Sequence, residues 1–394
     1  MDFDIVIVGG GLAGASLAAA LADTRQRVAL VERKAPPVPR PEWDARVYTL
    51  TPASIAFLER IGAWQRVSSE RITPIYDMHV AGDDGSSRLD FSAYESGLLR
   101  LGATVESGRL QRALWDGLER QSNLALLCPA SPAALHRSAG RVDIGLEGGR
   151  TARARLVVGA DGGDSWVRRA AGIDARSESY DQLGVVANFV CAREHRGIAY
   201  QWFLRDGVLA FLPLPERRVS IVWSTSRAHA RELLALAPDA LCARVGQASA
   251  GVLGDLQALT PPAAFPLSRM APRRIAQERV ALVGDSAHVV HPLAGQGINL
   301  GLGDAHCLAG LLAGAPDPGD SILLRRFERS RAEDILALHW ITHGLFRLFG
   351  TNHAMIRRIR NLGLNLTNSN PVIKTLLTRR ATAVGGGLHQ RETP

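Results

Sequence analysis

The sequence predicts an α/β protein with a Rossmann-like unit at its N-terminus, an inserted β-sheet domain that gives the middle of the chain an α+β character, and a helical C-terminus. Three observations predict this fold class. Residues 4–8 (DIVIV) and 28–32 (VALVE) are strand-like runs on either side of a helical pattern rich in glycine and leucine, which makes a βαβ unit. Further strand-like runs follow between residues 185 and 225. From about residue 297 the pattern is almost wholly helical.

The composition is typical of a soluble globular protein. The chain has 394 residues, of which 46% are hydrophobic and 21% charged, enough for roughly two to three domain-sized cores. No apolar run reaches the roughly 18 to 20 residues that span a bilayer, and no secretion signal precedes the first strand, so we expect a cytoplasmic protein. The four cysteines are scattered without a CxxC pattern, which favours buried thiols and predicts no metal site.

The net charge of +8 has an uneven origin. Of the 46 basic residues only Lys34 and Lys374 are lysines, and such a skew towards arginine is typical of codon bias rather than of phosphate recognition. From Trp340 to the end, eight cations face the single acid Glu392, which gives this region a charge of +7. We therefore expect no nucleic-acid partner and assign the excess charge to the C-terminal region.

A GxGxxG motif lies between the first strand and its helix. Gly9 permits the tight turn, Gly11 lets a pyrophosphate approach the backbone, and Gly14 lets the helix pack closely on the sheet. Glu32 ends the second strand about 20 residues on, where a carboxylate accepts a hydrogen bond from a ribose hydroxyl. A glycine-rich turn beside a surface acid is the alternative, but strand, helix and acid together favour a dinucleotide site.

A second glycine-rich segment distinguishes between the dinucleotides. A buried strand ends at Gly284-Asp285, and a turn then leads into a helix that begins near Gly297. The carboxylate suits a sugar-like hydroxyl, and the helix N-terminus offers N–H groups to an electron-rich carbonyl such as the pyrimidine edge of a flavin. This segment predicts FAD as the cofactor.

With a third motif, Gly159–Arg168 (GADGGDSWVR), the chain resembles the group A flavoprotein aromatic hydroxylases, the family of para-hydroxybenzoate hydroxylase. That family carries the same three motifs in the same order, and here they cover residues 1 to about 305. One departure is Ser286, where the family usually has alanine. The resemblance implies that Asp285 holds the ribityl chain, that Gly295–Asn299 hold the isoalloxazine, and that the third motif helps to bind FAD and the nicotinamide cofactor.

Two arginines match further family positions. The resemblance places Arg46 near the flavin and the incoming NAD(P)H, and Arg112 near the FAD phosphates, although in so arginine-rich a chain each also fits a solvated surface position. Arg46 and Pro292 are the residues expected nearest to catalysis. The complete set expected to bind FAD is Gly9, Gly11, Leu12, Ala13, Gly14, Glu32, Arg33, Arg46, Arg112, Asp161, Asp285, Pro292, Gly295, Gln296, Gly297, Ile298 and Asn299.

The chain has one dinucleotide fingerprint, which FAD occupies. The family's solution is transient binding of NAD(P)H, hydride transfer to the flavin, and reaction with O₂ to a C4a-hydroperoxyflavin that hydroxylates an electron-rich ring. The resemblance therefore implies no acid–base triad. His288 and His291 suit general bases, but their place in the flavin-contacting segment favours a structural role.

The resemblance also implies a division into domains. The expected flavin-binding domain comprises residues 1–75, 100–180 and 275–335, the substrate-binding sheet domain comprises residues 76–99 and 181–274, and a basic helical region comprises residues 336–394. Phe211 and Pro213 are expected to face the ring-binding cavity of the sheet domain together with Trp223, for which ordinary sheet core fits at least as well.

A narrower resemblance is to the ubiquinone-biosynthesis hydroxylases, in the 2-polyprenylphenol hydroxylase branch. The segments that carry it include Leu110–Trp115, Leu209–Leu214, Val219–Ser224 and Leu348–Asn352, and they fit the ring C5 type best. This implies a polyprenylated phenol or benzoquinol as substrate and a ubiquinone-synthesis complex as a further partner. The alternatives are a non-catalytic flavin-binding subunit of that complex and a group A monooxygenase of another aromatic substrate. A flavin-dependent halogenase is disfavoured because that family uses a catalytic lysine. The only lysines here, Lys34 and Lys374, lie after the second strand and in the C-terminal region.

The C-terminal region combines apolar and basic residues. Residues 335–350 (ILALHWITHGLFRLFG) are apolar, and residues 353–380 alternate apolar stretches with arginine pairs. A basic helical hairpin that exposes Leu345, Phe346, Leu348 and Phe349 would suit an anionic membrane surface, where polyprenyl substrates reside. The alternative is a helix docked on the flavin domain with its arginines in solvent. We expect peripheral association with the inner membrane rather than insertion.

Overall fold

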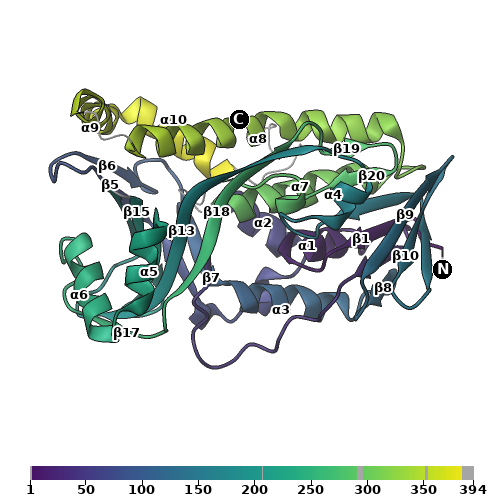
Figure 1. Ribbon diagram of the computed structural model, residues 1–394, viewed down its shortest axis with the longest axis horizontal. Coiled ribbons are helices and arrows are strands. Elements are labelled where there is room, and N and C mark those ends of the chain that lie inside the picture. The colour runs from purple at the N-terminus through teal and green to yellow at the C-terminus, as the bar shows by residue number, and fades with distance from the viewer. Residues whose placement is uncertain (1, 206, 291–295, 351–353, 384–394) are drawn as a thin grey trace.

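The computed structural model describes residues 2–205, 207–290, 296–350 and 354–383. A six-stranded sheet lies at the N-terminal end of the fold (Figure 1). Its strands in spatial order are β19 (Ala276–Gln277), β20 (Val280–Leu282), β12 (Leu156–Gly159), β1 (Ile5–Val8), β2 (Val28–Val31) and β8 (Leu124–Leu127). All neighbours pair in parallel except β19 and β20.

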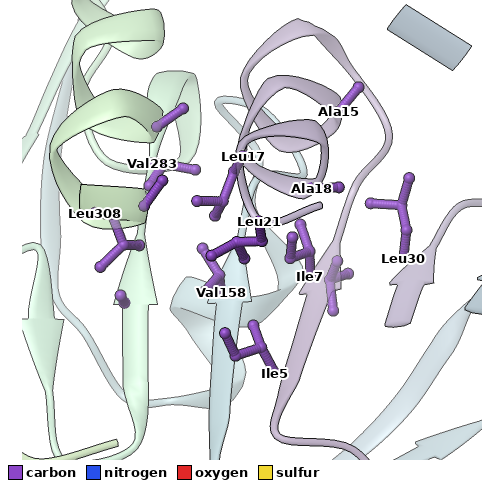
Figure 2. Packing of buried hydrophobic residues seen from close by; sticks show 14 of the residues in the cluster. Ile5, Ile7, Ala15, Leu17, Ala18, Leu21, Leu30, Val158, Val283 and Leu308 are labelled. Atoms are coloured by element: carbon purple, nitrogen blue, oxygen red, sulfur yellow. The ribbon is translucent and has the colours of Figure 1, made fainter. Parts of the chain in front are cut away.

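The central strands of this sheet are covered on both faces. Every residue of β1, β2 and β12 is buried, as expected for apolar runs in a parallel sheet. Helix α1 (Leu12–Ala20) packs beside helix α7 (Gly297–Leu312) on one face of the sheet, and Figure 2 shows Leu17 and Leu21 of α1 close to Val158 of β12. Helix α3 (Ser107–Leu118) packs on the other side of α1.

An eight-stranded, mainly antiparallel sheet forms the middle of the chain. It contains β17 (Leu256–Ala258), β13 (Ala175–Cys191), β16 (Arg218–Ser226), β15 (Gly207–Leu214), β14 (Ile198–Leu204), β5 (Asp77–Ala81) and β6 (Arg88–Ser92) in this order, with β18 (Ala263–Pro272) paired to β13. Helices α5 (Arg227–Ala235) and α6 (Pro238–Ala248) cover one face through a shared apolar cluster. At the interface with the Rossmann unit, Asn188 Nδ2 donates to the Asp44 carbonyl at 2.9 Å.

The described residues also form two small sheets and three short 3₁₀ turns. One small sheet contains β3 (Val47–Leu50), β7 (Gly102–Glu106) and β4 (Ile72–Ile75), and the other β11 (Thr151–Ala154), β10 (Arg141–Leu146) and β9 (Pro132–Ser138). Helices α2 (Pro52–Arg60) and α4 (Trp166–Ala170) follow β3 and β12, and the turns span Trp64–Arg66, Ser69–Arg71 and Gly284–Ser286.

Three helices at the C-terminal end run along one side of the molecule (Figure 1): α8 (Ser321–Gly350), α9 (Ala354–Asn368) and α10 (Pro371–Ala383). Helix α9 covers the edge strand β6, because the Asn365 and Asn368 side chains accept hydrogen bonds from the backbone N–H groups of Arg88 and Asp90. Within the described residues, no helix is both long enough and apolar enough to cross a bilayer.

The predicted fold class is confirmed: a Rossmann-like sheet with helices, a sheet-rich middle and a helical C-terminus. The domain boundaries stay a prediction. Strand β13 is continuous from Ala175 to Cys191 and pairs with β18 from its first residue, so it starts inside the segment expected to belong to the flavin-binding domain. The side chains of Leu345, Phe346, Leu348 and Phe349, expected to be exposed, lie outside the described residues.

Candidate active site

The three sequence motifs meet at one edge of the six-stranded sheet. They follow β1, β12 and β20, which are adjacent parallel strands, so their loops leave the sheet side by side at its carboxyl end. This is where open α/β sheets bind ligands. Gly9 has a φ of +106°, and a Cβ there would collide with the Ala160 carbonyl, so the first and third motifs are in direct contact.

The glycines of the first motif have different surroundings. Gly14 packs so closely on the Gly9 carbonyl that it has no room for a side chain. Gly11 is the N-cap of α1 with an ordinary φ of −68°, and no heavy atom lies within 4 Å of where its Cβ would stand. Open space at the N-terminus of a helix, where N–H groups and the helix dipole favour an anion, suits a pyrophosphate.

Glu32 lies beside this turn, at the end of β2. Its Oε2 accepts a hydrogen bond from Gly10 N at 2.6 Å and its Oε1 accepts one from Lys34 N at 3.1 Å. The indole of Trp115 in α3 also contacts this turn, because its Nε1 donates to the Gly10 carbonyl at 2.8 Å. The carboxylate is half-buried and oriented along the turn, the position expected for a ribose acceptor. Leu12 and Ala13 begin α1, and Arg33 is exposed.

Asp285, Arg46 and Tyr48 come together in front of the second motif. The Asp285 side chain is accessible to solvent, yet protein surrounds it closely enough that burial raises its pKa, and the charges of His288 and Arg46 oppose this shift. The Arg46 guanidinium lies 5.4 Å from the centre of the Tyr48 ring. Burial likewise raises the pKa of Tyr48. An accessible carboxylate in a recess, next to a cation and an aromatic ring, fits the sugar-like chain and ring of a flavin.

Asp304 of α7 fixes the turn that presents Asp285, and the sequence did not predict this role. Its carboxylate accepts hydrogen bonds from Gly284 N at 2.9 Å, His288 Nε2 at 2.6 Å and Arg331 Nε of α8 at 2.8 Å. Asp304 and Arg331 are 0% and 2% exposed. Burial alone would raise the pKa of Asp304, but His288 and Arg331 outweigh it and lower the pKa. The predicted structural role of His288 agrees with these contacts.

The third motif contacts both of the others through packing and hydrogen bonds. Asp161 accepts hydrogen bonds from Ser165 Oγ and from the backbone N–H groups of Trp166 and Val167, so its carboxylate caps α4. Arg168 is buried and donates to the Ser286 carbonyl at 3.0 Å. Ser286 Oγ in turn donates to the Gly159 carbonyl at 2.5 Å. The hydroxyl group of Ser286, where the family usually has alanine, therefore makes a hydrogen bond between the second and third motifs. The contribution of Asp161 to FAD binding stays a prediction.

The remaining expected residues divide into three groups. Gln296, Gly297 and Ile298 are half-buried at the start of α7, whereas Asn299 is buried and bridges α7 to β3 through the Thr49 carbonyl and Thr51 N. Pro292 and Gly295, together with His291, lie outside the described residues.

Other residues expected at the site have side chains that already make contacts within the protein. The Arg112 guanidinium is held by Asp116 and Glu119 of its own helix. Trp223 is buried in the cluster beneath α5 and α6, which agrees with the core alternative given for it. Phe211 is buried in the same cluster, and Pro213 is buried on β15. The roles of Arg112 at the phosphates and of Phe211, Pro213 and Trp223 at the substrate stay predictions.

The arrangement fits FAD on three counts: open space at Gly11, a carboxylate at the end of β2, and an accessible carboxylate at Asp285 that has no hydrogen-bond partner among the described residues. FAD, when bound, supplies the redox chemistry. Within the described residues, no group of histidine, cysteine and carboxylate side chains is arranged to hold a metal ion.

Comparison with known proteins agrees with this site. The FAD binding domain model matches residues 2–337. The chain is 37% identical to the ubiquinone hydroxylase UbiL of Rhodospirillum rubrum over 96% of its length and 89% of the relative's. It is 35% identical to the 3-demethoxyubiquinol 3-hydroxylase of Escherichia coli, with 94% and 96% covered. A crystal structure of a Pseudomonas aeruginosa PqsL mutant superposes with a TM-score of 0.79 at 27% identity, covering 92% of this chain and 99% of that one.

Fold, site and relatives together define a flavoprotein monooxygenase, with FAD as cofactor and NAD(P)H and O₂ as co-substrates. More narrowly, the chain belongs to the ubiquinone-hydroxylase family of FAD-dependent monooxygenases.

Proposed function

We propose that the protein hydroxylates the aromatic ring of a polyprenylated phenol or benzoquinol in ubiquinone biosynthesis. The observation that carries this proposal is the similarity at 35% identity or more, over at least 94% of the chain, to relatives named for hydroxylation in that pathway. The ring carbon is proposed as C5, from the motif resemblance. The Escherichia coli relative is named as a 3-hydroxylase. Ring position 3 is therefore the alternative that product analysis has to exclude.

The chain's own residues supply binding and positioning. Gly11 and the N-terminus of α1 receive the pyrophosphate, and Glu32 holds the neighbouring ribose. Asp285 orients the flavin side chain, with Arg46 as the adjacent cation that attracts the negatively charged nicotinamide cofactor. Asp304 keeps the Gly284-Asp285 turn in place. Exclusion of water and placement of the ring then rest on the eight-stranded sheet that faces the flavin unit.

The test is NAD(P)H oxidation by the FAD-loaded protein with and without a short-chain prenylated phenol, together with mass-spectrometric identification of the hydroxylated ring position. We expect oxidation to be stimulated by the phenol and coupled to product. If FAD is bound but the phenol causes no stimulation, the proposal is wrong, and the protein is either the non-catalytic subunit or a monooxygenase of another aromatic substrate. A deletion strain should accumulate the intermediate that lacks this hydroxyl, and wild-type quinone levels there would contradict the proposal.

We also propose that the basic C-terminal region contacts the membrane surface, where a polyprenylated substrate partitions. Its support is the charge of +7 from Trp340 onward and the exposed apolar side chains of the three C-terminal helices.

A further inference from the structure

Nine of the sixteen large apolar side chains that are exposed in the described residues belong to the three C-terminal helices. Leu336 and Trp340 of α8 are 58% and 76% exposed, and Val372 and Leu376 of α10 are 76% and 63% exposed. In both helices the two residues are four positions apart, so they form a stripe on one side. Tyr94 and Leu99, in the loop between β6 and β7, are 93% and 95% exposed. We call these six residues the docking face.

Two ion pairs bring these distant segments together. Lys374 Nζ of α10 lies 2.9 Å from Glu95 Oε2, in the same loop as Tyr94 and Leu99. Near the other end of α10, Arg380 lies 3.1 Å from Glu333 of α8, which is three residues before Leu336. Helix α10 therefore joins the stripe of α8 to the loop that follows β6. Figure 1 shows α8 and α10 along the same side of the molecule.

The charges of this region favour an anionic occupant. Residues 335–391 contain eight lysines and arginines and no aspartate or glutamate. Glu95 and Glu333, two acids that adjoin the docking face, are each paired with a cation of α10. The sequence of this region thus combines an excess of cations with apolar residues, which matches a surface of negative charge with an apolar interior. Trp340 and Tyr94 are also of the residue types that are enriched at membrane–water interfaces.

We propose that the docking face binds the surface of an anionic lipid bilayer, and that the loop with Tyr94 and Leu99 is part of it. This rests on the proposed function, which gives the enzyme a substrate with a polyprenyl chain, and it extends the contact from the C-terminal helices to the eight-stranded sheet. Because β6 belongs to that sheet, the bilayer then contacts the part of the protein proposed to hold the aromatic ring.

The test uses the full FAD-loaded chain and sedimentation with vesicles of phosphatidylcholine, with or without phosphatidylglycerol. We expect binding to the vesicles that contain phosphatidylglycerol, and weaker binding as salt is raised. Leu376→Glu and Tyr94→Glu should each weaken binding about tenfold or more, because each places a charge where an apolar side chain enters the interface. The matched control is Ile322→Glu: Ile322 is 64% exposed, like Leu376, but lies near the start of α8. It should bind as the unaltered protein does.

The possible outcomes separate the claims. If Tyr94→Glu binds like the control while Leu376→Glu does not, the loop is not part of the membrane contact and the inference is wrong. If no vesicle is bound and Leu376→Glu instead dissociates a dimer, the face is occupied by a second copy and the inference is wrong as well. Hydroxylation of a short-chain, water-soluble phenol should be unchanged in Tyr94→Glu. Absence of that activity in the unaltered protein, with the vesicle pattern intact, would refute the proposed function alone.

Discussion

Replacing Arg331 by methionine should destabilise the protein strongly. Arg331 and Asp304 are both almost fully buried, and the pair is joined by a 2.8 Å hydrogen bond. Methionine removes the cation and leaves the buried carboxylate with only His288 and Gly284 N as partners, which costs about 3–5 kcal/mol in the free energy of unfolding. The variant also loses the hydrogen bonds to the Leu300 carbonyl and to Asp334. Urea unfolding followed by circular dichroism measures the loss.

The pH dependence of this loss has a definite sign. In the native protein the pKa of Asp304 is lowered, so its contribution to stability is present above the unfolded pKa of about 3.9 and is lost as the pH falls through the folded value. Without Arg331, one of the two side chains that lower the pKa of Asp304 is lost, so this pKa should be higher than in the unaltered protein. The carboxyl group of the variant then takes up a proton at a higher pH than in the unaltered protein, which removes the negative charge that has lost its Arg331 partner. We therefore expect a larger difference between Arg331→Met and the unaltered protein at neutral pH than in mildly acidic buffer.

A double-mutant cycle separates the ion pair from lost packing. Asp304→Asn alone leaves Arg331 without its main partner, whereas the double variant leaves neither charge uncompensated. The double variant should therefore cost less than the sum of the single variants by about 1–3 kcal/mol. Arg325→Met, an exposed arginine on the same helix, is the control and should change stability by less than about 0.5 kcal/mol. Additive costs, or a loss that is independent of pH, would refute the assignment of Asp304 and Arg331 as a buried ion pair.

Three further predictions concern the glycine motif, the sheet core and a histidine. Gly11→Ala should leave the melting temperature of the apoprotein unchanged but weaken FAD binding about tenfold or more, measured by flavin fluorescence, whereas Gly14→Ala should fail to fold because its Cβ meets the Gly9 carbonyl. Phe211→Ala should cost about 3–5 kcal/mol in urea unfolding, and Phe211→Leu should keep the KM for the phenol; a raised KM would support the cavity role instead. Burial lowers the pKa of His339 to about 4, so stability should fall as the pH drops below 6.5, and His339→Gln should reduce that fall in unfolding titrations.

The parts of the fold that the sequence predicted depend on short spacings. The GxGxxG motif, Glu32 and the Gly284-Asp285 segment each belong to one strand–turn–helix unit, so local order suffices to place them. The neighbouring positions of β1, β12 and β20 then follow from a parallel sheet, although more than a hundred residues separate each from the next.

What the sequence did not predict depends on contacts between distant segments. Asp304 and Arg331 are 27 residues apart on two helices, and in a chain with this many arginines nothing marks Arg331 before α8 packs on α7. The sequence also did not show to which face of the sheet the Phe211 side chain points. Alternation along a strand gives two faces, and only the positions of α5 and α6 show which of them is the core. Arg112 fits a phosphate-binding position by motif, yet its own helix supplies two carboxylates at 2.5 Å.

A buried ion pair at the flavin turn needs a reason, because an apolar pair of similar volume is often as stable or more stable. Helix α8 suggests one. Trp340 of the docking face follows Arg331 by nine residues, about 14 Å along the same helix. Because Arg331 bonds to Asp304 and to the Leu300 carbonyl, α8 cannot slide along its axis without breaking contacts that hold the Gly284-Asp285 turn.

The pair would then serve geometry more than stability. The same contacts set the position of Asp285 and the position of the docking face relative to the flavin. The double variant, Arg331→Met with Asp304→Asn, distinguishes the two roles. If the pair defines geometry, this variant should recover most of its stability and still bind FAD more weakly than the unaltered protein. Full recovery of FAD affinity together with stability would show that the ion pair has no positioning role.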